Sequence, residues 1–280
     1  MKLIDFTVLT LSMFLSAAAM SAQPLYVGEF NIRNDNAKDA AAGNGWAVRC
    51  PVVCDILKVE SFDIFGTQEG LHNQLEDMHA ALPDYNYVGV GRNDGKTSGE
   101  YAAIFYNSDR VKCLSNGHFW LSETPEVVGS VGWDAKYTRI CTWGQFKDKK
   151  TGNKFYYVNT HLDHRGKEAQ KNGLKLIVER IGSINPEGYP MVLTGDFNIK
   201  PDNAGLVDLD TKMQSARKVA EKTDSHNTFN GWSVKKTDMI IDYIYVSGFS
   251  SCPEYKTVTE KYVERPFVSD HYPIISRLIF

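Results

Sequence analysis

The sequence predicts an α/β fold, a four-layer sandwich of two mixed β-sheets flanked by helices. Three observations indicate it. Short apolar or alternating runs typical of strands recur along the chain, segments with helical spacing lie between some of them, and several neighbouring strands are joined by hairpins. No repeat, low-complexity tract or change of composition divides the chain. We therefore expect one domain over residues 23–280.

The first 22 residues have the pattern of a signal peptide. Lys2 precedes a mostly apolar run over residues 6–20, and small residues follow the run. A membrane-spanning helix needs about 20 apolar residues, so this run is too short to be one. We expect cleavage near Ala22 and an exported chain, periplasmic or secreted, that begins about Gln23.

The next part of the chain is predicted to alternate strands and helices. Val53, Ile56 and Leu57 follow helical spacing in the first helix, and Pro83 ends the second. The polar loop 92–99 is rich in Gly, Asp, Asn and Ser, and we interpret it as a solvent-exposed turn rather than as a lip of a substrate site. The expected elements are strand 25–31, loop 34–45, helix 49–60, strand 63–69, helix 71–82, and strands 85–91 and 101–106.

The rest of the chain contains hairpins, one long helix and further strands. The turn 148–153 has the composition of a hairpin loop. Leu174, Ile177 and Ile181 share one face of a helix expected over residues 165–181. The remaining strands are expected at 111–121, 139–146, 155–159, 190–193, 240–247, 255–263 and 274–280.

The cysteines do not indicate a metal site. There are five, so at least one stays unpaired if the others form disulfides. Cys50 and Cys54 have helical spacing, but no second pair of ligands at zinc spacing accompanies them. We interpret the cysteines as small buried residues, with a disulfide allowed but not required.

Residues 191–198 are the most informative stretch for function. The apolar run that ends at Leu193 predicts a buried strand, and Gly195 lets the chain turn so that Asp196 and Asn198 emerge together at its end. An ordinary turn is the alternative, because Asp and Asn are favoured in turns. Four further polar clusters follow apolar runs in the same way: Asn31, Gln68–Glu69, Asn159–Thr160–His161 and Ser269–Asp270–His271. We expect all of them at one mouth of the domain.

The acidic residues of these clusters suit a hard metal ion. Glu69 and Asp270 offer carboxylate oxygens, and Asn31 adds an amide oxygen. Mg²⁺ and Mn²⁺ prefer such oxygen ligands, and Mg²⁺ is usually held by few carboxylates and several waters. We expect Mg²⁺ as the cofactor, with Mn²⁺ as the alternative.

The histidines suit proton transfer. His271 could act as a general base if a carboxylate held its second nitrogen, and Asp242, alone in an apolar strand, is the candidate. The alternative for Asp242 is that it faces water or a structural donor. His161 could offer a proton or a hydrogen bond to a phosphoryl oxygen.

Six motifs together resemble those of the endonuclease/exonuclease/phosphatase superfamily, which has a deoxyribonuclease-like fold. They occur in the family's order and cover nearly the whole chain after residue 22. Bacterial exported members near the deadenylase-like branch are the most similar. The motifs are Phe30-Asn31-Ile32-Arg33, Gln68-Glu69, Asn159-Thr160-His161-Leu162-Asp163-His164, Gly195-Asp196-Phe197-Asn198, Ile241-Asp242-Tyr243-Ile244 and Ser269-Asp270-His271-Tyr272-Pro273.

The resemblance implies a two-sheet sandwich and Mg²⁺-dependent hydrolysis of a phosphate ester by in-line attack of water. It implies that Glu69 holds the metal, with Asn31 alongside and Asp270 close to it. The catalytic domain would then span residues 23–280.

The resemblance also assigns roles in the reaction. Asp196 would position or deprotonate the attacking water, and Asn198 beside it would contact the phosphate. His161 would donate to a phosphate oxygen. His271, oriented by Asp242, would bind or protonate phosphate oxygens or act as the base. Arg139 and His164 are further candidates for substrate contact, with a salt bridge and a solvated helix start as their alternatives.

Charge bears on the substrate. The net charge of −3 provides no strong basic field for steering nucleic acid. We therefore expect a phosphodiester or a small phosphorylated molecule, and no obligate protein partner. The alternatives are a secreted nuclease, either an endonuclease or a 3′–5′ exonuclease, and a non-catalytic binding protein on the same fold. The completeness of the acids, amides and histidines disfavours the second, and motifs of zinc or serine hydrolases are lacking.

Overall fold

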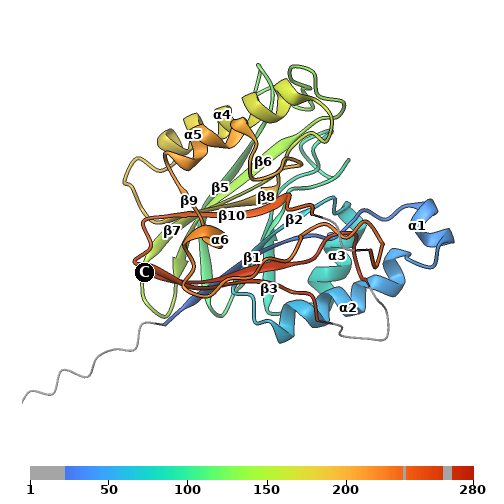
Figure 1. Ribbon diagram of the computed structural model, residues 1–280, viewed down its shortest axis with the longest axis horizontal. Coiled ribbons are helices and arrows are strands. Elements are labelled where there is room, and N and C mark those ends of the chain that lie inside the picture. The colour runs from blue at the N-terminus through green and yellow to red at the C-terminus, as the bar shows by residue number, and fades with distance from the viewer. Residues whose placement is uncertain (1–22, 236–237, 261–266) are drawn as a thin grey trace, which may run out of the picture.

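The computed structural model describes residues 23–235, 238–260 and 267–280. They form two six-stranded mixed sheets that pack together, with helices on the two outer sides (Figure 1). The predicted sandwich is therefore confirmed. The expected signal peptide and the end of the strand expected at 255–263 lie outside the described residues. Within the described ranges, no helix has the length and apolar character needed to cross a membrane.

The first sheet has the strand order β11-β12-β1-β2-β4-β3. Its strands β1 and β2 run parallel, and every other neighbouring pair in it is antiparallel. The bounds are β1 Leu25–Asn31, β2 Ile64–Gln68, β3 Tyr85–Val88, β4 Ile104–Asn107, β11 Ser251–Thr257 and β12 Ile274–Ile279.

The second sheet has the order β5-β6-β7-β8-β10-β9 and the same design. Its strands β7 and β8 run parallel, and its other neighbours are antiparallel. The bounds are β5 Val111–Trp120, β6 Ile140–Asp148, β7 Lys154–His161, β8 Met191–Asp196, β9 Gln214–Ser215 and β10 Asp242–Ser247.

Helices cover the outer face of each sheet (Figure 1). Helices α2 (Trp46–Val59) and α3 (His72–Ala81) pack on the first sheet, and α4 (Lys167–Ile184) packs on the second. The segment expected as a loop at 34–45 contains the short helix α1 (Ala37–Ala41), because the Asn36 side chain caps its first turn. Residues 204–219, for which we made no prediction, form η1 (Ala204–Leu206), α5 (Val207–Asp210) and α6 (Ala216–Val219) around β9.

Alternation along the strands builds three apolar layers. In β8, for example, Val192 faces the other sheet, whereas Leu193 faces the outer helix. The five cysteines join this packing or lie half-buried, and none forms a disulfide.

Buried polar side chains connect the two sheets near the site. The Asn159 amide in β7 donates to the carbonyls of Thr67 in β2 and of Ala103 just before β4, each at 2.9 Å, and its oxygen accepts from Gln68 at 2.7 Å. A Cβ on Gly66 would lie 2.3 Å from the Asn159 oxygen, so this close approach requires glycine. These bonds fix how the strand ends of one sheet lie against those of the other.

Candidate active site

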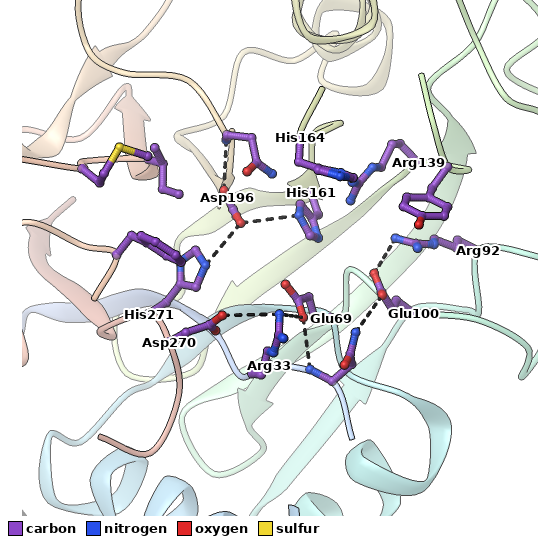
Figure 2. Close-up of a pocket in the computed structure, with 16 residues that line it drawn as sticks. Arg33, Glu69, Arg92, Glu100, Arg139, His161, His164, Asp196, Asp270 and His271 are labelled. Carbon is purple, nitrogen blue, oxygen red and sulfur yellow. Dashed lines mark hydrogen bonds and ion pairs between the residues drawn. The ribbon is translucent and has the colours of Figure 1, made fainter. Parts of the chain in front are cut away.

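The parallel pairs of both sheets end at the same edge of the sandwich. Strand β1 ends at Asn31, β2 runs into Glu69, β7 ends at His161 and β8 ends at Asp196. Their side chains surround a cavity of about 580 Å³ that Glu69, His161, Asp196, Asp270 and His271 line (Figure 2). The single mouth expected from the sequence is therefore observed.

Three residues that line this cavity have left-handed backbone. Arg33, Glu69 and Asn198 have φ angles of 57°, 63° and 53°. Non-glycine residues adopt such angles uncommonly, and strained backbone gathers at functional sites. At each position the chain leaves its strand abruptly, which turns the side chain into the cavity.

On the first-sheet side, two carboxylates face one positive charge. Arg33 Nη1 lies 3.6 Å from Glu69 Oε2 and 3.4 Å from Asp270 Oδ2 (Figure 2). Glu69 Oε2 also accepts from the backbone N–H of Asn34 at 3.2 Å. The two predicted metal-binding carboxylates therefore converge on a common point.

Asn31 departs from the orientation that the sequence suggested. Its oxygen accepts from the Arg33 backbone N–H at 3.0 Å. Its nitrogen lies 3.3 Å from Glu69 Oε1 and 3.1 Å from Asp196 Oδ2. We expected an amide oxygen beside the metal, but here Asn31 donates to carboxylates of both sheets and so holds them together.

Asp196 is the buried carboxylate at the centre of the second-sheet side. Its Oδ1 accepts from the backbone N–H of Asn198 at 3.0 Å, and its Oδ2 lies 3.4 Å from His161 Nε2 and 3.7 Å from His271 Nε2. Burial raises the pKa of Asp196 to about 7, against the opposing effect of His271. A carboxylate that gains and loses its proton near neutral pH suits a general base.

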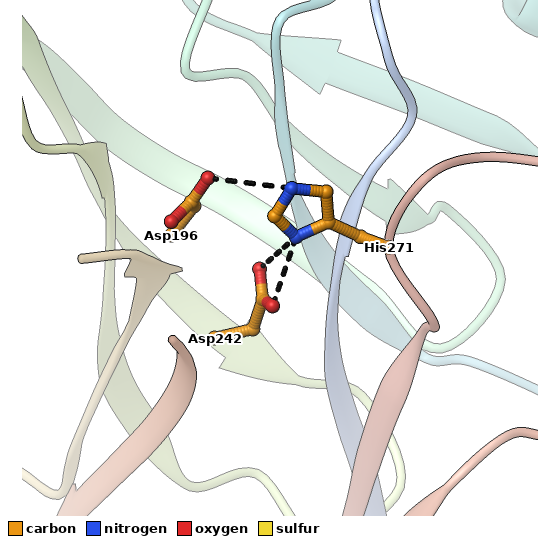
Figure 3. Close-up of side chains that lie close together, drawn as sticks. All are labelled: Asp196, Asp242 and His271. Atoms are coloured by element: carbon orange, nitrogen blue, oxygen red, sulfur yellow. Dashed lines mark hydrogen bonds and ion pairs between the residues drawn. The ribbon is translucent and has the colours of Figure 1, made fainter. Parts of the chain in front are cut away.

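Asp242 and His271 form the predicted pair (Figure 3). Both Asp242 oxygens lie 2.9 Å from His271 Nδ1. Burial alone would lower the pKa of His271, but the negative charges of Asp242 and Asp196 outweigh it and raise this pKa well above its usual value. His271 is therefore protonated at neutral pH. Because Asp242 begins β10 and His271 precedes β12, the pair joins the two sheets.

His161 has the opposite charge state. Burial, and then the charges of Arg139 and Arg92, lower the pKa of His161 well below its usual value. The cavity thus places a neutral imidazole and a protonated imidazole on either side of Asp196.

Arg139 and His164 lie beside this neutral imidazole. Arg139 Nη2 is 3.2 Å from His164 Nδ1, and Arg139 Nε is 3.5 Å from Asp163. The salt bridge that the sequence left as an alternative for Arg139 is therefore present, and both side chains also line the cavity. Asn198 lines it too, while its amide donates to the Leu162 carbonyl at 3.1 Å.

Known proteins share the sequence pattern of this chain. A family model described as "Endonuclease/Exonuclease/phosphatase family" matches residues 29–271. The chain belongs to the endonuclease/exonuclease/phosphatase family. The predicted hydrolase of phosphoric esters is thereby confirmed, because the proteins of this family act on such esters.

Individual proteins resemble this chain over most of its length. A mannosyl-6-phosphatase of Bacteroides thetaiotaomicron is 40% identical, with a TM-score of 0.88, over 91% of this chain and 100% of that chain. An uncharacterised mimivirus protein, L388, is 27% identical over 82% of this chain and 91% of its own length. The human Nocturnin catalytic domain shares the fold, with a TM-score of 0.71 at 16% identity over 91% of this chain and 93% of that chain.

Several residues that line the cavity were not predicted from the sequence. Arg92 and Glu100 line one wall, although we interpreted the loop between them as a solvent-exposed turn. Residues 93–98 are indeed exposed or half-exposed, but the two ends of the loop turn inward. Glu100 precedes the buried run 101–105, whereas the polar clusters used as the signal all follow such runs, so this signal does not include it.

Glu29 was also missed. It lies in β1 and is fully buried, and burial and then the charge of Asp242 raise its pKa well above the usual value. A charged residue in an otherwise apolar strand is the signal that could have drawn attention to it.

Proposed function

We propose that the chain is an exported, Mg²⁺-dependent phosphoesterase that hydrolyses a small phosphorylated molecule by in-line attack of water. The observation that carries this proposal is the environment of Asp196. This carboxylate, with a pKa near 7, lies between a neutral and a protonated histidine in the cavity that the Glu69–Asp270 pair also lines. These groups can activate water and bind a phosphate in one place.

The Glu69–Asp270 pair fits a hard divalent cation. Both carboxylates face one point, and the Arg33 guanidinium balances there the negative charge that a bound cation would balance. Asp196, Asp242 and His271 also offer ligand atoms within 4.8 Å of one another, but the Asp242 oxygens there already bind His271. We therefore assign Mg²⁺, or Mn²⁺ in its place, to Glu69 and Asp270. When bound, it supplies the charge that neutralises phosphate oxygens and polarises the phosphorus.

The chain's own residues would carry the proton transfers. Asp196 takes a proton from the attacking water. At the same time the water oxygen bonds to phosphorus, and the bond from phosphorus to the ester oxygen breaks. His271, held protonated by Asp242, donates Nε2–H to a non-bridging phosphate oxygen, and His161 donates its single N–H to another. The leaving oxygen takes a proton from solvent.

The volume of the cavity and the activity of a similar protein both support a small substrate. A cavity of about 580 Å³ accommodates a small molecule. A relative of 40% identity that covers 91% of the chain is a mannosyl-6-phosphatase. Together with a net charge of −3, these support a monoester such as a sugar phosphate over long duplex DNA.

A substrate panel tests this function. The purified chain is assayed in Mg²⁺ with sugar phosphates, p-nitrophenyl phosphate, bis-p-nitrophenyl phosphate, phosphoinositides, single-stranded oligonucleotides, poly(A) RNA and plasmid. We expect turnover of small esters that EDTA abolishes. Rapid plasmid nicking that salt suppresses, with little turnover of small esters, would establish a secreted nuclease instead. Inactivity on every ester in both Mg²⁺ and Mn²⁺ would favour a binding protein.

Export is tested separately. Lys2 and the apolar run 6–20 support a cleaved signal peptide. The intact mass of protein recovered from outside the cytoplasm should match a chain that starts near Gln23. Retention of Met1 would contradict it.

A further inference from the structure

We propose that Arg92, Glu100 and Asn34 form a subsite that binds the alcohol part of the ester, and that it selects an alcohol carrying several hydroxyls, such as a hexose. This inference rests on the proposed function, because it names the leaving group of the same reaction. Neither the family match nor the sequence motifs include these three side chains in a site.

The subsite adjoins the pair of carboxylates that we assign to the metal. Asn34 connects the two places. Its backbone N–H donates to Glu69 Oε2 at 3.2 Å, and its side-chain amide donates to Glu100 Oε1 at 3.1 Å. A group that leaves phosphorus near Glu69 therefore meets Glu100 next.

The position of the subsite also agrees with the direction in which the alcohol would leave phosphorus after in-line attack. Figure 2 shows Arg92 and Glu100 on the opposite side of the cavity from His271, with Glu69 and His161 between. Water activated at Asp196, beside His271, would push the leaving oxygen away from that side. The alcohol would then extend towards the wall that Arg92 and Glu100 form.

This wall is held rigidly. Arg92 Nη1 and Glu100 Oε2 are 2.5 Å apart, and the Arg92 backbone N–H donates to the Glu100 carbonyl at 3.1 Å. The Trp120 indole donates to the Arg92 carbonyl at 2.7 Å. The side chains of Arg92 and Glu100 are only 12% and 17% exposed. Their position is thus set before any substrate binds, as specific recognition requires.

The chemistry of the wall matches hydroxyl groups. A carboxylate only accepts hydrogen bonds and a guanidinium only donates them, whereas a hydroxyl does both. A second phosphate would meet the negative charge of Glu100. The Tyr137 ring, which is 44% exposed and lies 5.8 Å from the Arg92 guanidinium, adds an apolar face for the C–H groups of a sugar ring. A polyol satisfies all of these groups together.

Two matched esters test the subsite. Glucose 6-phosphate or mannose 6-phosphate is compared with cyclohexylmethyl phosphate, which has the same six-membered ring and CH₂–O–P link but no hydroxyls. A hexose can add hydrogen bonds to the remaining lone pairs of Glu100 and the remaining donors of Arg92 that a cyclohexyl ring cannot make, so we expect kcat/KM of the wild type to favour a hexose phosphate by at least about 100-fold. Glu100→Gln should reduce this preference at least about tenfold.

A control variant matches the charge change. Glu126 pairs with Arg180 at 2.7 Å on the surface, and its side chain is 72% exposed. Glu126→Gln therefore removes the carboxylate of another Arg–Glu pair, and it should leave the preference unaltered. Equal losses on both esters in Glu100→Gln would mean that Glu100 acts on the phosphate or the metal, and would overturn the subsite. An absent preference in the wild type would do the same.

Failure of the proposed function has a different signature. In that case the wild type would hydrolyse neither ester. The subsite is then judged by binding of the free hexose, measured by NMR titration. Weaker hexose binding in Glu100→Gln than in Glu126→Gln supports it, and equal binding or none in the wild type overturns it.

Discussion

The two sheets present carboxylates to one cavity in different surroundings. On the first-sheet side, Glu69 and Asp270 share a guanidinium at 3.6 and 3.4 Å. On the second-sheet side, Asp196 is 3% exposed and faces an amide and two imidazoles. Glu69 and Asp196 both lie at the end of a parallel strand, so backbone position does not separate their roles. Their neighbours do. The two carboxylates that face a common cationic point suit metal binding, whereas a single buried carboxylate between imidazoles suits proton transfer.

The largest expected effect comes from making Asp196 unable to accept a proton. Asp196→Asn keeps the shape and the hydrogen bond from Asn198 but removes the base. General-base catalysis contributes roughly 10²–10⁴-fold, so we expect kcat to fall by about 10³. The Mg²⁺ concentration for half-maximal activity should stay within a factor of about three. Loss of less than about tenfold in kcat would assign the base elsewhere.

Glu69→Gln should show the opposite pattern. Removing one of two carboxylates weakens a site for a hard cation, so half-maximal activity should require at least about tenfold more Mg²⁺, with kcat reduced by about 10². Titration of both variants with Mg²⁺, with circular dichroism as the control for folding, separates the two halves. Full activity of the wild type in EDTA would show that the Glu69 side of the cavity binds no metal that the reaction needs.

The pair that joins the halves should behave as one unit. Asp242→Asn and His271→Gln each disturb the same protonated imidazole, and we expect each to lower kcat/KM by about 10². The double variant should lose little more than either single variant, because the two side chains are coupled at 2.9 Å. Losses that multiply in the double variant would show that the residues act independently.

The smallest expected effect is on pH dependence. Asp196 must be ionised to accept a proton, and burial raises its pKa to about 7. Therefore kcat/KM should rise about tenfold per pH unit below pH 7 and level off above it. A nearby divalent cation favours the ionised form of Asp196, so more Mg²⁺ should move this rising part of the pH profile, its acidic limb, to lower pH. A limb that persists unaltered in Asp196→Asn would belong to another group.

Much of the site was predictable because it follows one rule. Asn31, Glu69, His161 and Asp196 each come at the end of an apolar run, and the carboxyl ends of parallel strands meet at one edge. The rule places side chains but does not orient them. Asn31 shows this, because its oxygen binds the Arg33 backbone instead of facing the cavity.

The wall with Arg92 was not predicted because local composition conflicts with tertiary contact. Residues 92–99 have the composition of an exposed turn, and their middle is exposed. What turns the ends inward is a hydrogen bond from Trp120, 28 residues later, and the pair with Glu100. Such contacts between distant residues leave no periodic signal in the sequence. For the same reason the short elements between residues 204 and 219 escaped prediction.

The placement of β12 bears on the order in which the protein folds. This strand pairs with both β11 and β1, so residues 274–279 enter the first sheet between the strand that precedes them and the first strand of the described residues. Asp270 and His271 are held by that insertion. A partly folded chain in which residues 274–279 have not yet paired therefore has an incomplete first sheet and an incomplete catalytic centre. Pairing between such distant segments is slow, so activity should appear as a late step when the denatured protein refolds.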